Sequence, residues 1–490
     1  VVRVLWAFAT LKIKNEALFN ALANLAGTGI QNFGEAGIAT IAWAFATHGI
    51  RNEALFNALA KEAIRTIQSF SAQSLVDLAW AFSKLGIKNE ALFAALAISS
   101  EKIAPKFSAK NIEILTWSFS TLKMQHKALF TALSREFIKK VKNFDAAGIA
   151  KTARAFATLH IGNEALVKAL ITEASQRIES FCAHDMANLA WAFAKLGIKD
   201  KALFNALARQ AERTIQSFST QDLLDTALAF ASVGMQDLGP FSALGKEAAQ
   251  RIQGVGAQDL ARAAWAFAQL GVRDEALFNA LAEEAKDKIQ NCAEAGIANT
   301  AWAFAELHIR KEELFNALAI QCTQNIQSLS PEDLAETAWA FANLDIHNEA
   351  LFNALATQAT QKIQNFSAED LVNIAWAFAE LNIRNEALFN ALAIQAQQKI
   401  QQFNAAQLAD TAWAFAQLGI RNDALFNAMA IQATQNIQNF STQDLANIAY
   451  VFARFGIRND ALFNALAIQA TQTIHQFNPA NLADTACAFA

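Results

Sequence analysis

The sequence predicts an all-α fold, namely an α-α superhelix (solenoid) of about 13 tandem 37-residue helix-turn-helix repeats. The first observation is that the tetrapeptide Trp-Ala-Phe-Ala and its close variants recur every 37 residues along the whole chain. The second is that each period contains two stretches with the apolar spacing of an amphipathic helix, separated by a short polar loop. The third is that only 4 Pro and 18 Gly occur among 490 residues, which leaves little material for long linkers or β-turns.

The residue that opens this tetrapeptide is called the anchor, and four anchors hold Arg154, Leu228, Tyr450 and Cys487 in place of tryptophan. Because no insertion or deletion interrupts the period, we predict one continuous array over residues 1–490. The chain opens and stops within copies of the pattern, so we expect it to be a piece of a longer protein. The other anchors are all ten tryptophans of the chain: Trp6, Trp43, Trp80, Trp117, Trp191, Trp265, Trp302, Trp339, Trp376 and Trp413.

The first helix of each repeat carries its own start and stop signals. In one copy Ser441 is a favourable N-cap with Asp444 three residues later, and Gly456 supplies the C-terminal stop. In two other copies proline follows the cap residue, at the first helical position where its missing N–H is tolerated. The positions two and five residues from the anchor on either side share one broad face, which we predict to be the core; in one copy they are Leu408, Thr411, Phe415 and Leu418.

The second helix follows a loop of about three residues. Asn459 is its expected N-cap, and the helix is predicted from Asp460 to about His475. Its apolar face carries leucine, phenylalanine and alanine at helical spacing. One helix pair cannot bury that face alone, so repeats must stack on one another in a file.

Composition and motifs exclude several classes of function. The net charge is −4, so no global basic field attracts nucleic acid. The 4 Cys are scattered without metal-ligand spacing, the 7 His do not cluster with Cys or acids at such spacings, and no phosphate loop or nucleophile motif occurs. No apolar run is long enough to span a membrane. We therefore expect no enzyme activity, no cofactor, no small-molecule substrate and no membrane insertion.

Two variable rows of residues follow the first helices. The upstream row lies three residues before each anchor and the downstream row four residues after it, so both lie on one helix face with the anchor at its edge. We consider these rows base-reading candidates for single-stranded RNA, with bases stacking near the tryptophans. The upstream candidates are Thr40, Asp77, Lys151, Asn188, Asp225, Arg262, Asn299, Glu336, Asn373, Asp410, Asn447 and Asp484; the downstream candidates are Thr47, Lys84, Lys195, Gln269, Asn343 and Gln417.

The alternative explanation of these rows is structural. Any solvated helix face drifts freely while repeats are duplicated, and aromatic residues at helical spacing are usually buried. The variation is compatible with either explanation.

A third row, the loop row, lies eight residues after the anchor and is rich in cations. These nine cations are phosphate-binding candidates, because one positive charge per repeat matches a backbone with one negative charge per nucleotide. Most are followed two residues later by an acid, so a rim of solvated charge pairs is the alternative. The candidates are Lys14, Arg51, Lys88, Lys199, Arg273, Arg310, Arg384, Arg421 and Arg458.

Charge is uneven along the chain. Residues 101–154 contain eleven basic and four acidic residues, a net charge of +7, while the remainder carries −11. This stretch is the best candidate for binding a polyanion, with a solvated helix face as the alternative.

The motif Asp-Leu-Ala-Asn-Ile-Ala-Tyr-Val-Phe-Ala at residues 444–453, followed by Ala-Leu-Phe-Asn-Ala-Leu at 461–466, resembles the octotricopeptide and heptatricopeptide repeats. These are relatives of the pentatricopeptide repeats, found in organellar RNA-binding proteins of algae and other protists. The resemblance covers essentially the whole chain, and the 37-residue period agrees with the heptatricopeptide variety. It implies an α-solenoid in a mitochondrion or chloroplast that binds single-stranded RNA, either mRNA or rRNA, along its concave surface at roughly one nucleotide per repeat.

The leading hypothesis is therefore sequence-selective binding of single-stranded RNA, in organelle RNA processing, stability, translation or ribosome assembly. The alternative is a protein-binding scaffold or a structural subunit of a large assembly.

Overall fold

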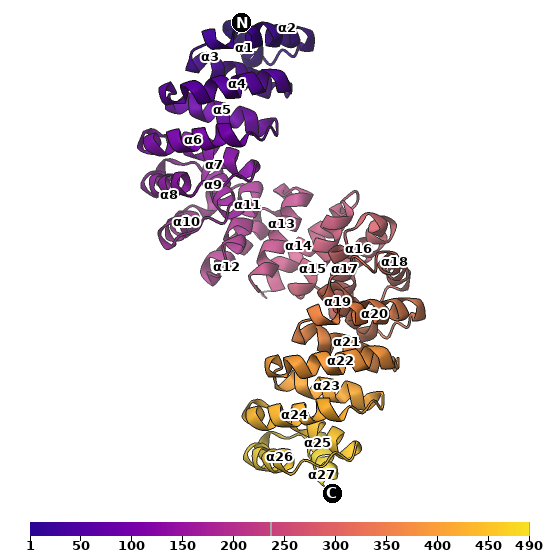
Figure 1. The fold of residues 1–490 in the computed structure, drawn as a ribbon. Coiled ribbons are helices and arrows are strands. Elements are labelled where there is room, and N and C mark those ends of the chain that lie inside the picture. The colour runs from indigo at the N-terminus through magenta and orange to yellow at the C-terminus, as the bar shows by residue number, and fades with distance from the viewer. Residues whose placement is uncertain (236–237, 490) are drawn as a thin grey trace. The chain divides into compact units, whose positions relative to one another are not determined.

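The computed structural model describes residues 1–235 and 238–489, and in this part of the chain it contains 27 α-helices and eleven short 3₁₀ helices but no strand. The chain divides into two compact units, Val1–Glu247 and Ala248–Ala490, which we call unit 1 and unit 2 and describe separately. Within each unit, consecutive first helices pack side by side and so do consecutive second helices, which confirms the predicted all-α solenoid (Figure 1). The continuity of the array over residues 1–490 stays a prediction.

In unit 1 every 37-residue copy forms the two expected helices. The first helices are α1 (Val2–Thr10), α3 (Glu35–Thr47), α5 (Ala72–Lys84), α7 (Ala109–Thr121), α9 (Ala146–Thr158), α11 (Ala183–Lys195) and α13 (Thr220–Ser232). The second helices are α2 (Glu16–Thr28), α4 (Glu53–Thr66), α6 (Glu90–Ile103), α8 (Lys127–Lys140), α10 (Glu164–Gln176) and α12 (Lys201–Arg213), and α14 (Leu238–Arg251) contains the boundary between the units.

Unit 2 repeats this organisation. Its first helices are α15 (Ala257–Gln269), α17 (Glu294–Glu306), α19 (Pro331–Asn343), α21 (Ala368–Glu380), α23 (Ala405–Gln417), α25 (Thr442–Arg454) and α27 (Pro479–Phe489). Its second helices are α16 (Glu275–Lys288), α18 (Glu312–Gln324), α20 (Glu349–Lys362), α22 (Glu386–Lys399), α24 (Asp423–Asn436) and α26 (Asp460–Thr473).

The caps read from the sequence hold the first helices. Ser441 and Asp444 form a reciprocal capping box at the start of α25, and Ser330 forms one before the proline that opens α19. The residue six after the anchor has a positive φ, between 52° and 70°, in all thirteen described copies. Seven of these residues are glycine, including Gly456, which confirms the predicted stop. The other six, among them Lys123 and Asp345, hold a left-handed conformation that is strained for a side chain.

The second helix predicted from Asp460 to about His475 ends two residues earlier than the sequence predicts. Asn459 caps α26 by accepting a hydrogen bond from the backbone N–H of Leu462, as expected. The α-helix then stops at Thr473, and Ile474–Gln476 form a 3₁₀ turn instead of continuing to His475. The tighter turn places the following Phe477 in an extended conformation that leads the chain into the next repeat.

Pairs of phenylalanines join most second helices to the first helix of the next repeat. Phe93 and Phe119 in unit 1 and Phe389 and Phe415 in unit 2 pack edge to face, each pair with ring centroids 4.9 Å apart. All four rings are buried, and each contributes about 2–3 kcal/mol of burial. The predicted core positions of α23, including Thr411, are buried as well, which confirms the expected core face.

Cations at the ends of second helices bind the carbonyls of the preceding repeat. Lys140 Nζ donates to the backbone oxygens of Pro105 and Phe107, both at 2.8 Å. Lys362 does the same with the oxygens of Gln327 and Leu329, at 2.7 and 2.6 Å. Equivalent bonds are formed by Arg177, Lys288 and Lys399. In these five repeats one positive charge thus satisfies backbone carbonyl groups after the end of the preceding second helix.

Candidate nucleic-acid interface

The tryptophan anchors are neither core residues nor free surface residues. From Trp43 to Trp413 every one is half-buried, while the small residues on both sides of each are buried. The last aromatic anchor, Tyr450, is 43% exposed. Each ring therefore packs against its own layer of first helices and keeps one part accessible, which is the arrangement that stacking on a base requires.

Cavities between neighbouring first helices bring the anchors and the upstream row together. One of about 270 Å³ in unit 2 is lined by Trp302, Glu336, Trp339, Glu369 and Asn373. Its residues come from three consecutive first helices, α17, α19 and α21. Another of about 270 Å³ in unit 1 contains Trp80 and Trp117 together with Lys110, Glu113, Ile114 and Lys151. The predicted alignment of anchors with upstream residues from adjacent repeats is thus present in both units.

The cavities include a row that the sequence reasoning missed, seven residues before each anchor. This N-terminal row contributes Lys110 and Glu369 to the cavities above. It also binds the upstream row, because Nε2 of Gln73 donates to Asp77 at 2.7 Å and Gln443 donates to Asn447 at 2.8 Å. The spacing of four residues between the two rows is the signal that could have revealed it.

Upstream residues are mostly half-buried, and that burial changes their acidity. Burial raises the pKa of Glu336 to about 7, and the nearby carboxylates of Glu332 and Asp333 add to the rise. Burial also raises the pKa of Asp77, against the opposing effect of the Gln73 hydrogen bond, and the pKa of Asp410. A protonated carboxyl group at this surface can donate a hydrogen bond as well as accept one.

Several base-reading candidates already have partners within the chain. Asn343 donates to the backbone oxygen of Ala305 at 2.9 Å and so links two first helices. The hydroxyls of Thr40 and Thr47 donate to oxygens of their own helices, and Arg262 pairs with Asp259 at 3.2 Å. The side chain of Asp484 lies outside the described residues.

Other candidates lie more openly along the first helices. In the downstream row Lys84, Lys195, Gln269 and Gln417 are exposed. In the upstream row Asn299 and Asn373 are half-buried, and Lys151 is exposed and lies 3.8 Å from Glu113. Asn188 and Asp225 are buried and belong to a larger cavity described below.

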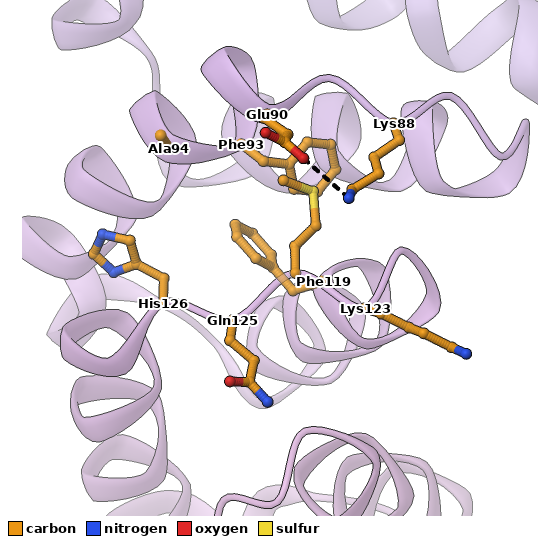
Figure 2. Close-up of a pocket in the computed structure, with 9 residues that line it drawn as sticks. Lys88, Glu90, Phe93, Ala94, Phe119, Lys123, Gln125 and His126 are labelled. Carbon is orange, nitrogen blue, oxygen red and sulfur yellow. Dashed lines mark ion pairs between the residues drawn. The ribbon is translucent and has the colours of Figure 1, made fainter.

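The loop row is exposed, and most of its members form ion pairs with the acid two residues later. Lys88 pairs with Glu90 at 3.0 Å beside a cavity of about 310 Å³ that also contains His126 (Figure 2). Among the described residues, Lys199 and Arg273 form no ion pair. Exposed pairs of this kind contribute about 0–1 kcal/mol, so a phosphate can compete for the cation. The paired members are Lys14, Arg51, Lys88, Arg310, Arg384, Arg421 and Arg458.

Charge separates the two units clearly. Unit 1 contains 27 basic and 20 acidic residues, a net charge of +7, and unit 2 contains 13 and 24, a net charge of −11. The same contrast holds on the anchor stripe, which we define as the N-terminal, upstream, anchor and downstream rows. In unit 1 its charged residues are Arg3, Lys84, Lys110, Lys151, Arg154 and Lys195 against Asp77 and Asp225; in unit 2 they are Arg262 and Arg454 against Glu306, Glu332, Glu336, Glu369, Glu380 and Asp410 among the described side chains.

In residues 1–235 and 238–489, no group of three or more His, Cys, Asp or Glu has a geometry that could hold a metal ion. Within the same ranges no helix combines the length and hydrophobicity of a membrane span.

Stacked helix hairpins with one partly accessible row of aromatic residues define an α-helical repeat protein. The chain belongs to the RNA-editing substrate-binding complex 6 protein family, which matches residues 1–275, 81–346 and 303–490. Overlapping matches are expected when near-identical repeats align in more than one register.

Curated proteins and solved structures add no information on function. Among curated proteins, none matches the sequence. A chain of known fold, described as a homology model of the full-length AP-3 complex in an intermediate open conformation, is similar over 99% of this chain and 86% of that chain. The sequence identity is 10% and the TM-score 0.38, so this likeness supports no functional conclusion.

Proposed function

We propose that the chain binds single-stranded RNA sequence-selectively along the anchor stripe of unit 1. The observation that carries this proposal is the cavity shared by adjacent first helices, where half-exposed tryptophans lie beside variable polar side chains. Each base stacks on an anchor and its edge contacts upstream and downstream residues. The family to which the chain belongs supports RNA as the partner, because its name refers to binding the substrate of RNA editing.

The positive stripe of unit 1 supports the phosphate contacts. Lys84 and Lys195 are exposed on downstream positions and form no ion pair among the described residues. The ion-paired loop row adds weaker cations at the ends of the same helices. The resemblance to heptatricopeptide repeats adds the finer parts of this proposal: roughly one nucleotide per repeat, in a mitochondrion or chloroplast, during RNA processing, stability, translation or ribosome assembly.

The test is the salt dependence of RNA binding. An oligouridylate of roughly seven nucleotides, one per anchor of unit 1, is titrated with the full chain at several salt concentrations. Each lost phosphate contact makes the negative slope of log K against log salt shallower by about 0.7. The double variant Lys84→Gln with Lys195→Gln is therefore expected to make it shallower by about 1.4. The matched control is Lys61→Gln with Lys168→Gln, two exposed lysines on second helices. Binding that is insensitive to salt in the native chain would overturn the proposal.

A second function, binding of a basic protein partner, is favoured for unit 2. Its anchor stripe carries six described carboxylates against two arginines, which repels phosphate and attracts lysine or arginine. Tryptophans such as Trp302 and Trp339 flank Glu336 in the cavity, and an aromatic face also attracts cations. The unit would then act as the scaffold part of the chain.

An arginine-rich peptide provides the test of this second function. Glu306→Gln with Glu380→Gln is expected to weaken peptide binding several-fold while leaving the affinity for oligouridylate unchanged. An equal effect of the two substitutions on both ligands would contradict separate functions for the two stripes.

A further inference from the structure

Arg154 occupies an anchor between two tryptophan anchors, Trp117 and Trp191, in unit 1. Its guanidinium carbon lies 4.8 Å from the centroid of the Trp191 ring, so the cation packs over the aromatic face. Nη1 donates to Oδ1 of Asn188 at 2.6 Å, and it lies 3.9 Å from a carboxylate oxygen of Asp225. Three consecutive first helices, α9, α11 and α13, therefore position one arginine.

A cavity of about 500 Å³ surrounds this arginine, compared with about 270 Å³ for the cavities between tryptophan anchors. Its wall includes Trp117, Lys151, Arg154, Asn188, Asp222 and Asp225. The volume lies within the range of about 300–1,000 Å³ that is usual for small-ligand pockets. With a guanidinium in place of the bulky indole, this cavity is larger than those at Trp80–Trp117 and Trp302–Trp339.

The polar groups of the cavity are divided into donors and acceptors. Arg154 has further N–H groups beyond the one that Asn188 accepts, and Lys151 supplies an ammonium group. Asp225 is only 9% exposed, and it accepts a hydrogen bond from Gln221 at 3.1 Å, which leaves lone pairs unused. Asp222 is already bound to His184 at 2.8 Å. Two buried carboxylates make the cavity unsuitable for a phosphate, so a neutral base with both donors and acceptors fits better.

We propose that this cavity is a guanine-selective position of the RNA-binding surface; the inference rests on the RNA-binding function proposed above. Guanine presents O6 and N7 as a pair of acceptors, which is the edge that arginine binds with two hydrogen bonds. It also presents N1–H and the N2 amino group, which a carboxylate such as Asp225 accepts. Uracil offers one acceptor and one donor to the same groups, and adenine offers an amino group where arginine needs an acceptor.

The experiment measures the affinity of the full chain for oligouridylates in which a single guanosine is scanned through every position. At one position guanosine is expected to tighten binding about tenfold over uridine. Inosine, which lacks the N2 amino group, and 7-deazaguanosine, which lacks N7, are each expected to lose part of this gain.

Three variants separate the pocket from the rest of the surface. Arg154→Trp installs the residue found at most other anchors and is expected to lose the guanosine preference. Arg154→Lys keeps the charge but not the planar fork, and loses most of the preference without changing the salt slope. Asp225→Asn abolishes the difference between guanosine and inosine. Tyr450→Trp, at an anchor in unit 2, is the comparator and keeps the preference.

The outcomes distinguish the two proposals. Oligouridylate binding without any guanosine preference, or a preference that survives Arg154→Trp, overturns the guanine pocket alone. No binding of any oligonucleotide overturns the RNA-binding function together with this inference. Circular dichroism melting of Arg154→Trp checks that the array is folded. If it is not, Arg154→Lys tests whether the guanosine preference depends on the guanidinium.

Discussion

Units 1 and 2 are built from the same hairpin, yet their anchor stripes carry opposite charges. The pairs Phe93–Phe119 and Phe389–Phe415 have the same centroid distance, and serine and asparagine caps start helices in both units. A residue of positive φ follows the first helices in both units. The stripes differ because their rows only partly contact the core, so substitutions there leave the packing unchanged. The comparison teaches that in a repeat array the core fixes where ligand-binding side chains lie, and the surface rows decide what they bind.

The first prediction tests whether the two cores are equivalent. Phe93→Ala in unit 1 and Phe389→Ala in unit 2 are each expected to lower the free energy of local opening by about 3–5 kcal/mol, because each removes a fully buried ring. Amide hydrogen exchange of the affected helices gives the measurement. If the two losses differ by more than about 2 kcal/mol, the cores are not interchangeable and the comparison fails.

The second prediction exchanges the charges of the stripes. Lys84→Glu with Lys195→Glu in unit 1 is expected to weaken oligouridylate binding by about ten- to hundredfold, because two attractive contacts become repulsive. Glu306→Lys with Glu380→Lys in unit 2 is expected to tighten it, by up to about tenfold. Fluorescence anisotropy at constant salt measures both. Changes of less than twofold in both variants would show that the stripes do not carry the phosphate contacts.

The third prediction concerns how the stability of unit 2 depends on pH through one carboxyl group of its acidic stripe. The pKa of Glu336 is about 7 in the folded chain, above its ordinary value of 4.5, so folding favours the protonated form. The stabilisation is fully present below about pH 4.5 and is lost as the pH rises through 7. Because the group is partly exposed, the loss is discounted to roughly 1–2 kcal/mol. Hydrogen exchange of α19 is therefore expected to slow, relative to the intrinsic rate, as the pH falls from about 8 to 5.

Glu336→Gln removes that titration. It is expected to stabilise α19 at pH 8 and to flatten the pH profile, whereas Glu380→Gln, at an exposed carboxylate of the next first helix, has little effect. An unchanged profile in Glu336→Gln would assign the pH dependence to another group.

The smallest expected effect is at the left-handed position that both units share. Lys123→Gly in unit 1 and Asp345→Gly in unit 2 relieve a strained backbone conformation, and each is expected to stabilise its hairpin by about 0.5–1 kcal/mol. Gly86→Ala, at the same position of another repeat, is expected to destabilise by about 1 kcal/mol. Urea unfolding monitored by circular dichroism measures the three variants, and a stabilising Gly86→Ala would contradict the explanation.

The fold was predictable because its signals are local and repeated. Ser441, Gly456 and Asn459 mark helix ends through contacts with residues three or four positions away, and the period of 37 fixes their register in every copy. The 3₁₀ turn at Ile474–Gln476 escaped prediction, since its residues also suit an α-helix and the path of the chain decides between the two.

The candidate site was predictable only in outline. The placement of anchors beside upstream residues follows from helix geometry, so Trp302 and Glu336 could be expected near each other. The bonds of Lys362 to carbonyls 33 and 35 residues earlier, and the link from Asn343 to Ala305, depend on how repeats stack. Sequence spacing within one helix contains no such information. The cavity at Arg154 likewise needs three first helices to be in place before its chemistry is visible.

The unbroken 37-residue period has a consequence for how such a protein changes over generations. Unequal recombination between two copies inserts or deletes a whole hairpin, and the new junction reproduces an interface that the parent already had. Each such event lengthens or shortens the recognised sequence by one unit without any search for a new core. Diversification can then proceed one side chain at a time on a scaffold that tolerates it.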